Sequence, residues 1–317
     1  MYSRRRFVER TSLLAGTLLL DWESLFTAQA QSTDTGPIVH RQFPLNSEPR
    51  SPRLGAGFLT SQADFYIRNH GTIPTLSEAG YSVHLQIPGS AAPNLSLADL
   101  KSKFPRRSMN AVMQCAGNRR ADMGKFKSVS GDAWRVGAIS NASWMGVGLG
   151  DVLRSVGVHD SPNMHVAFAA HDDIEEEGEH FKFGVSIPLA KALAPESMLV
   201  FQMNGQDLTA AHGFPLRVVI PGYAGVRSPK WLAAISVQDR PSDNHIQQKE
   251  YKLFPPDVTK QTVDLSKEPF INDMPLNSAI LMPSDDTTVP AGKKQCPWIC
   301  DCHQRSSRSC GTVLRRR

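Results

Sequence analysis

The stretch MQCAGNRRADM, Met113–Met123, contains the only cysteine of the first 295 residues. The residues around it, SMNAVMQCAGN (Ser108–Asn118), predict a strand that runs into a loop, which places Cys115 at a strand end. A lone cysteine is commonly a small buried apolar side chain. Alternatively it is a thiolate that ligates a metal or attacks a substrate, and the nearby Arg119 and Arg120 favour a thiolate. A Cys–His hydrolase would need the same thiol, but no His and Asn/Asp pair singles it out.

Short elements alternate irregularly on both sides of this stretch. Ser96–Phe104 predicts a helix with a serine N-cap, and Met145–Val158 predicts a second short helix that a glycine closes. Ser197–Leu208 predicts a hairpin around Asn204-Gly205, a pair typical of type I′ turns. The irregular order indicates a mixed α+β fold. Further strands are predicted in Asp64–Pro74, Tyr81–Gly89, Phe214–Tyr223 and Lys230–Asp239.

The positive charge of the chain is concentrated at its two ends. The chain has 317 residues and a net charge of +5, but residues 31–290 alone carry −2. A nucleic-acid-binding protein usually carries its basic residues on the folded domain, so this class loses its main support. The chain also has no uninterrupted apolar run of the roughly 18 residues that a membrane-spanning helix needs.

The N-terminal residues 1–30 have the composition of a targeting segment. Three arginines, Arg4, Arg5 and Arg6, precede a moderately apolar run, and Ala28–Ala30 forms a small-x-small cleavage site. The arginines favour twin-arginine export, which carries folded proteins to the periplasm, over an ordinary secretory signal or a basic N-terminal helix.

Residues 291–317 form a Cys/Arg-rich tail of a different character. Four cysteines, Cys296, Cys300, Cys302 and Cys310, lie there, and the chain ends in three arginines. A zinc site with His303 is one reading, but the cysteine spacing does not match the paired CxxC pattern. An unstructured tail, produced for example by a frameshift, fits the composition better.

CAGNRR (Cys115–Arg120) resembles the signature of the sulfite oxidase family of molybdenum enzymes, which also includes plant-type nitrate reductases. Further blocks resemble the family in its order, over about residues 40–290: YIRNHGTIP (Tyr66–Pro74), GAISNASWMGVGLGDVL (Gly137–Leu153), HGFPLRVVIPGYAGVRSPKWL (His212–Leu232), QQKEYKLFPP (Gln247–Pro256) and PLNSAI (Pro275–Ile280). The resemblance implies an α+β molybdopterin-binding domain over residues 31–290. The family's C-terminal immunoglobulin-like β-sandwich, which forms its dimer, is expected to be lacking here, so a homodimer is doubtful.

The resemblance implies a molybdenum–pyranopterin cofactor with Cys115 as the metal ligand. Soft sulfur ligands suit such a metal. A phosphate on the pterin needs hydrogen-bond donors and positive charge. The positions that match the family's phosphate contacts are His212, Arg217, Ser228 and Lys230, and those that match its pterin contacts are Asn69, His70 and Asp172.

The resemblance also implies a pocket for a small oxyanion. The matching positions are Arg68, Arg120, Trp134 and Tyr251. Cations fixed in a dry site can hold such an anion and offset charge that develops in the reaction. A tyrosine at position 251 favours sulfite oxidation, because the nitrate reductases lack one there.

The implied reaction is the oxidation of sulfite to sulfate by oxygen-atom transfer. No CxxCH haem motif occurs in the chain, so the expected electron acceptor is a separate periplasmic c-type cytochrome. No nucleic acid partner and no membrane anchor after signal cleavage are expected. Two alternatives stay open: a molybdenum oxidoreductase for another oxyanion or sulfur compound, and an inactive truncated chain that only binds the cofactor.

Overall fold

The computed structural model describes residues 36–89, 94–255, 257–259, 262–283 and 298–301. The chain divides into two units, Met1–Gly36 and Pro37–Arg317, and the fold described here is that of the second. The predicted targeting segment, residues 1–30, lies outside the described residues, as does the Cys/Arg-rich tail apart from 298–301.

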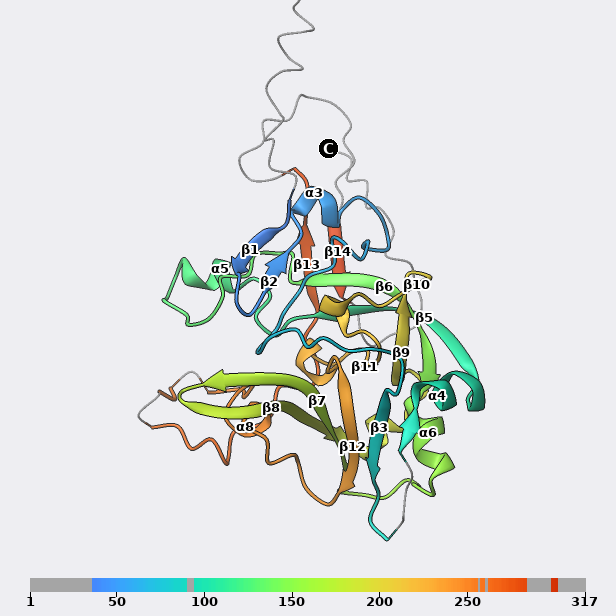
Figure 1. The fold of residues 1–317 in the computed structure, drawn as a ribbon. Helices are drawn as coiled ribbons and strands as arrows, with labels where there is room; N and C mark the ends of the chain where they lie inside the picture. The colour runs from blue at the N-terminus through green and yellow to red at the C-terminus, as the bar shows by residue number, and fades with distance from the viewer. Residues whose placement is uncertain (1–35, 90–93, 256, 260–261, 284–297, 302–317) are drawn as a thin grey trace, which may run out of the picture. The chain divides into compact units, whose positions relative to one another are not determined.

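Two five-stranded sheets form the frame of the second unit (Figure 1). The first has the order β10-β9-β6-β5, and β11 also pairs with β9. Its strands are β5 (Arg106–Gln114), β6 (Ile139–Gly148), β9 (Met198–Met203), β10 (Gln206–Asp207) and β11 (Arg217–Val219). The second has the order β4-β3-β12-β7-β8. Its strands are β3 (Ser82–Gln86), β4 (Leu95–Ser96), β7 (His165–Glu176), β8 (Glu179–Pro188) and β12 (Leu232–Gln238). Because β12 pairs parallel with β3 and antiparallel with β7, the second sheet is mixed, and with the short helices it gives the predicted combination of sheet and helix.

The remaining elements are short. The helices are α3 (Ser51–Leu54), α4 (Leu97–Lys103), α5 (Arg120–Gly124), α6 (Leu149–Ser155), α7 (Leu189–Ala192) and α8 (His245–Gln248), with the 3₁₀ turns η1 (Ala210–His212) and η2 (Gly225–Arg227). Two ribbons pair β1 (Ile38–Arg41) with β2 (Asn46–Glu48), and β13 (Asn277–Ile280) with β14 (Trp298–Asp301). The tail was expected to lack regular structure. Strand β14 differs from that expectation, because antiparallel pairing with β13 provides partners for its backbone hydrogen-bonding groups.

Local signals located several elements correctly. In α4, Ser96 and Asp99 form a reciprocal capping box, which satisfies backbone donors at the first turn. The β9–β10 hairpin turns at Asn204 and Gly205, whose φ angles of 53° and 77° are those of a type I′ turn. The predicted strand 108–118 is β5, and it ends one residue before Cys115.

Two element predictions were wrong. Met145–Gly148 belong to strand β6, and only Leu149–Ser155 form the helix α6. The reason is a close backbone approach between β6 and β9, at which a Cβ on Gly146 would lie 1.9 Å from the Leu199 carbonyl oxygen. In Asp64–Pro74 only an isolated bridge forms, between Ile67 and Ser47.

The main hydrophobic core takes side chains from both sheets. Val147 and Leu199 come from the first sheet, and Val83, Phe168 and Leu232 come from the second. A second cluster contains Met113, Cys115, Trp134 and Trp144, so the cysteine lies within packed apolar structure. Among the described residues, no helix has the length and apolar character that crossing a membrane would require.

Because β6 and β9 approach so closely at Gly146, we expect one added methyl group there to destabilise the fold strongly. Gly146→Ala should lower the free energy of unfolding by roughly 1–3 kcal/mol or more, because backbone has to move to relieve the clash. Urea denaturation measures this change. The control Gly124→Ala adds its methyl group in open space and should leave stability unchanged or slightly higher. Equal stability of both variants would contradict the tight β6–β9 contact.

Candidate functional site

A cavity lies beside Cys115, with about 650 Å³ of empty space that includes its opening to solvent. Its wall is formed by segments that are distant in sequence. They are the end of β5, the loop that leads from α3 to β3, strand β7, the residues around η2, and Tyr251 after α8. Its lining comprises Phe65, Tyr66, Arg68, Asn69, His70, Met113, Cys115, Ala116, Asp172, Phe183, His212, Arg217, Gly225, Val226, Ser228, Pro229, Lys230, Trp231 and Tyr251. Every predicted site residue is therefore at this cavity except Arg120 and Trp134.

Cys115 presents a nearly buried thiol to the cavity, with 6% of the residue exposed. Its backbone amide donates to the Ala138 carbonyl at 2.9 Å, and its Sγ accepts from the Gly117 amide at 3.4 Å. Burial raises the pKa of the thiol, whereas Arg68, the Gly117 amide and Arg120 act to lower it. These three groups favour the thiolate. A positively charged ligand such as a metal would compensate for the water that burial removes from the sulfur.

Buried Glu48, which the sequence did not indicate, supports the position of Cys115. Its two carboxylate oxygens accept from the backbone amides of Arg135 and Gly137 at 2.7 and 2.8 Å. The next residue, Ala138, provides the carbonyl that holds the Cys115 amide. Glu48 is 87 and 89 residues from these partners in sequence, so no local pattern could have found it.

Arg120 turns back over its own loop. A Cβ on Gly117 or on Gly131 would lie 2.5 or 2.8 Å from the Arg120 guanidinium, so both positions need glycine for this packing. The guanidinium Nη1 donates to the Asp132 carbonyl at 2.8 Å. Arg120 is therefore close enough to act electrostatically on Cys115, but it does not line the cavity.

Trp134 is fully buried behind the cavity wall. Its ring makes an edge contact with Tyr66, with centroids 6.5 Å apart, and a tilted contact with His40 at 4.7 Å. Because Tyr66 lines the cavity, Trp134 supports a wall residue. The places in a substrate pocket that the sequence predicts for Trp134 and Arg120 stay a prediction.

Arg217 and Lys230 place positive charge in the cavity lining, and Arg217 is buried whereas Lys230 is partly buried. The Arg217 guanidinium donates to the carbonyls of His212 and Ser228 at 3.0 and 3.1 Å and lies 5.2 Å from the Trp144 ring centroid. Burial lowers its pKa to about 10, so it stays protonated at neutral pH. Neither cation has a carboxylate within ion-pair distance in the described part of the chain.

Lys230 is held by neutral acceptors. Its Nζ donates to the Ala211 carbonyl at 2.9 Å and to the Asn69 side-chain oxygen. Burial, and then the charge of Arg217, hold the pKa of Lys230 well below its usual range. A bound anion would offset both effects and favour the protonated amine, so this wall favours an anionic ligand.

His212 and Ser228 complete the same wall as neutral groups. His212 bonds through Nε2 to the Gln62 carbonyl at 2.8 Å, and burial lowers its pKa to about 4, so the ring is uncharged at neutral pH. The Ser228 hydroxyl oxygen accepts from the Ile220 amide at 3.0 Å. Its hydroxyl proton can be donated to a ligand in the cavity.

Arg68, His70 and Tyr251 gather on the side nearest the thiol. The Tyr251 hydroxyl lies 2.7 Å from His70 Nε2. Burial, and then the charges of Arg68 and Lys230, hold the pKa of His70 well below its usual range, so this imidazole is neutral. Burial also raises the pKa of Tyr251, which keeps its phenol protonated. The group offers one cation and one hydroxyl donor to an oxyanion.

Two buried polar side chains next to the cationic wall and the thiol lack partners. Asp172 is 3% exposed, and its Oδ1 has no hydrogen-bond partner in the described structure. Asn118 has both side-chain amide atoms buried without a partner there. Unsatisfied buried polar atoms are rare unless a ligand or water meets them. Sequence reasoning gave Asn118 no role, although it lies within CAGNRR.

The buried Asp172 carboxyl should make the stability of the cofactor-free chain depend on pH. Burial raises its pKa from 3.8 to about 6. The folded state therefore binds more protons than the unfolded state between these values and loses stability as pH rises through that window. Asp172→Asn should therefore raise the free energy of unfolding relative to the wild type, and this gain should be larger at pH 7.5 than at pH 4 by up to about 3 kcal/mol.

Chemical denaturation of the cofactor-free chain at the two pH values tests this prediction. The exposed neighbour Asp173, which pairs with Lys182, provides the matched control Asp173→Asn. Equal effects of Asp172→Asn at both pH values would contradict a raised pKa.

The chain is similar to proteins of known activity. Residues 70–246 match the family model described as the oxidoreductase molybdopterin binding domain. Mitochondrial sulfite oxidase of Rattus norvegicus is 41% identical over 80% of this chain and 47% of its own length. Sulfite oxidase of Arabidopsis thaliana is 40% identical over 80% of this chain and 67% of its own length. The chain thus spans about half the length of the mammalian relatives that it matches.

The fold is similar to that of a solved structure, the sulfane dehydrogenase SoxCD from Paracoccus pantotrophus. The TM-score is 0.65 at 22% identity, over 82% of this chain and 64% of that one. This likeness concerns the fold, whereas the family model covers residues 70–246, which include Cys115, Arg217 and Lys230 of the cavity but not Arg68, Asn69 or Tyr251. The chain belongs to the family of molybdopterin-binding oxidoreductases of the sulfite oxidase type.

Proposed function

We propose that the chain oxidises sulfite to sulfate with a molybdenum–pyranopterin cofactor bound in the Cys115 cavity. The observation that carries the proposal is one buried thiol that shares a cavity with buried Arg217 and partly buried Lys230, two basic side chains without carboxylate partners in the described structure. This donor set fits the cofactor, because a thiolate suits the metal and the cations suit a phosphate. The orphaned Asp172 Oδ1 adds an acceptor for a ring N–H.

The cofactor, when bound, supplies oxygen-atom transfer and stores two electrons. Cys115 would hold its metal through the thiolate. His212, Arg217, Ser228 and Lys230 would hold the phosphate, and Asn69, His70 and Asp172 would contact the pterin. The low pKa of His70 and His212 keeps both rings neutral, so each ring can accept or donate one hydrogen bond without adding charge.

Arg68 and Tyr251 would bind the substrate. Arg68 is partly buried in the same cavity as the thiol, and although burial alone lowers its pKa, Tyr251 and Cys115 raise it, so the guanidinium keeps its charge. Its charge matches a sulfite dianion, and the Tyr251 hydroxyl can donate to a sulfite oxygen. Arg120 would add longer-range positive charge. In a site with little water these fixed groups stabilise the anion more than solvent would.

The proposed overall reaction consumes sulfite and water and yields sulfate, two protons and two electrons. We propose that the electrons pass to a separate c-type cytochrome. Twin-arginine export through residues 1–30 would place the folded protein in the periplasm with that acceptor. Residues 1–30 carry the sequence pattern that supports this location.

The first test is the dependence of molybdenum content on Cys115. The protein matured in cells should contain about one molybdenum per chain by elemental analysis, and Cys115→Ser should lose most of the metal and the sulfite oxidation, because a hydroxyl is a poor soft ligand. The control Met109→Leu, on the same strand, should keep both. Full molybdenum together with unchanged sulfite oxidation in Cys115→Ser would contradict the cysteine as a metal ligand.

The second test concerns Arg68. Arg68→Met should lower kcat/KM for sulfite by roughly 10²–10³-fold, as loss of a fixed charge from an active site commonly does, and should leave molybdenum content unchanged. The control Arg107→Met removes a guanidinium paired with Asp151 at the surface and should keep the activity.

Assays with ferricyanide and with a c-type cytochrome as the electron acceptor test the oxidation of sulfite and the identity of the acceptor separately. Turnover with ferricyanide alone would contradict the proposed acceptor but not the substrate. Molybdenum with no turnover on sulfite, and turnover on another sulfur compound or oxyanion, would contradict the substrate.

A further inference from the structure

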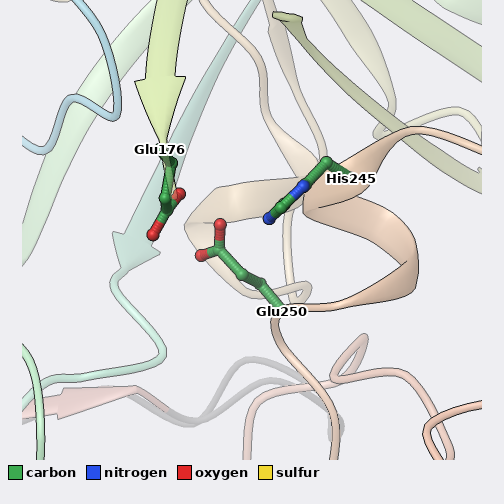
Figure 2. Close-up of side chains that lie close together, drawn as sticks. All are labelled: Glu176, His245 and Glu250. Carbon is green, nitrogen blue, oxygen red and sulfur yellow. The ribbon is translucent and has the colours of Figure 1, made fainter. Parts of the chain in front are cut away.

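A second cluster of titratable side chains lies outside the cofactor cavity. Glu176 ends strand β7, His245 begins helix α8, and Glu250 follows that helix by two residues. One ligand atom of each side chain lies within 4.8 Å of the others. Figure 2 shows the two carboxylates facing each other and the imidazole directed at Glu250.

His245 is held in the orientation that a metal ligand needs. Its side chain is 8% exposed, and its Nδ1 lies 2.9 Å from the Glu179 carboxylate. Its ring stacks on Phe181 with centroids 4.5 Å apart and an interplanar angle of 11°. Metal-binding histidines are usually fixed by a carboxylate on one ring nitrogen while the other nitrogen faces the ion. Nε2 here faces the cluster and has no hydrogen-bond partner within the described ranges.

The two carboxylates leave a local excess of negative charge. Glu250 Oε1 is buried with no partner among the described residues. No lysine or arginine of the described chain forms an ion pair with Glu176 or Glu250, since Lys249 pairs with Glu179 instead. His70 Nε2 lies 3.7 Å from Glu250 Oε2 but is occupied by Tyr251. Two apposed carboxylates need a cation or a shared proton between them.

We propose that Glu176, His245 and Glu250 bind a divalent cation, of which Zn²⁺ best suits one imidazole nitrogen and two carboxylate oxygens. Zn²⁺ takes nitrogen and oxygen ligands at about 2.0–2.2 Å in a tetrahedral arrangement, so its ligand atoms lie about 3.4 Å apart. Small side-chain rotations would bring the three groups from their present spacing to that distance. Water completes the fourth position, because Glu176 is exposed at the end of its strand.

The site is separate from the molybdenum ligand. None of its three residues lines the cofactor cavity. It is nevertheless adjacent to it, because Glu250 precedes Tyr251 and approaches His70. The proposal does not depend on the identity of the substrate.

The test is a calorimetric titration of the full, cofactor-loaded chain with Zn²⁺ alone, near pH 7. The four cysteines of the tail could also bind Zn²⁺, so the site is defined by the difference between variants. Glu176→Gln and His245→Ala should each lose one Zn²⁺ equivalent or bind it at least tenfold more weakly. Glu179→Gln, which keeps all three ligands but frees the ring, should weaken binding about 10-fold to 100-fold.

The matched control is Glu175→Gln. Glu175 is the preceding residue of the same strand, its side chain points to the opposite face, and its carboxylate lies 4.0 Å from the exposed His180. This control removes the same charge and should keep the wild-type Zn²⁺ equivalent. Equal stoichiometry and affinity in the wild type and all four variants would overturn the site and leave a shared proton between the two carboxylates.

Discussion

Buried positive charge without a protein counter-ion is the constraint on which this site depends. Arg217 and Lys230 lie in a packed wall, held by carbonyl and amide oxygens and by aromatic faces. Removing such charges from water is expensive unless an opposite charge compensates them. The described chain supplies no carboxylate at ion-pair distance, and the proton on Lys230 is already weakly held. The wall is therefore built for an anionic group that the protein does not itself contain.

The thiol is subject to the same balance of effects. Burial disfavours its ionised form, and Arg68 with the Gly117 amide offsets part of that penalty. Glu48 keeps the segment that leads into β6 in place through the backbone amides of Arg135 and Gly137. A rigid support of this kind allows one sulfur to be held at a defined position, which a metal ligand requires. Arg68, the Gly117 amide and Glu48 thus all serve to position or stabilise the one residue that would bind the metal.

The predictable parts of the fold were those governed by short-range rules. The capping box at Ser96 and the Asn204-Gly205 turn need only neighbouring residues, and the structure contains both. The segment Met145–Gly148 was misassigned because four residues are too few to show the period of a helix or of a strand by themselves. Its conformation is decided by the backbone of β9, about 50 residues further along the chain. The position of Cys115 was predicted because strand β5 ends beside it.

The sequence by itself determined the chemistry available: one thiol in the body of the chain, a set of cations, and a motif order that identifies the family. The tertiary structure alone decided which of those side chains share a cavity. It brought Arg68, Tyr251 and Lys230 to Cys115, turned Arg120 back over two glycines, and placed Trp134 behind Tyr66. It also brought Glu176 to His245 and Glu250. Such contacts depend on strand pairing and on packing between residues far apart in the chain, which a local pattern does not contain.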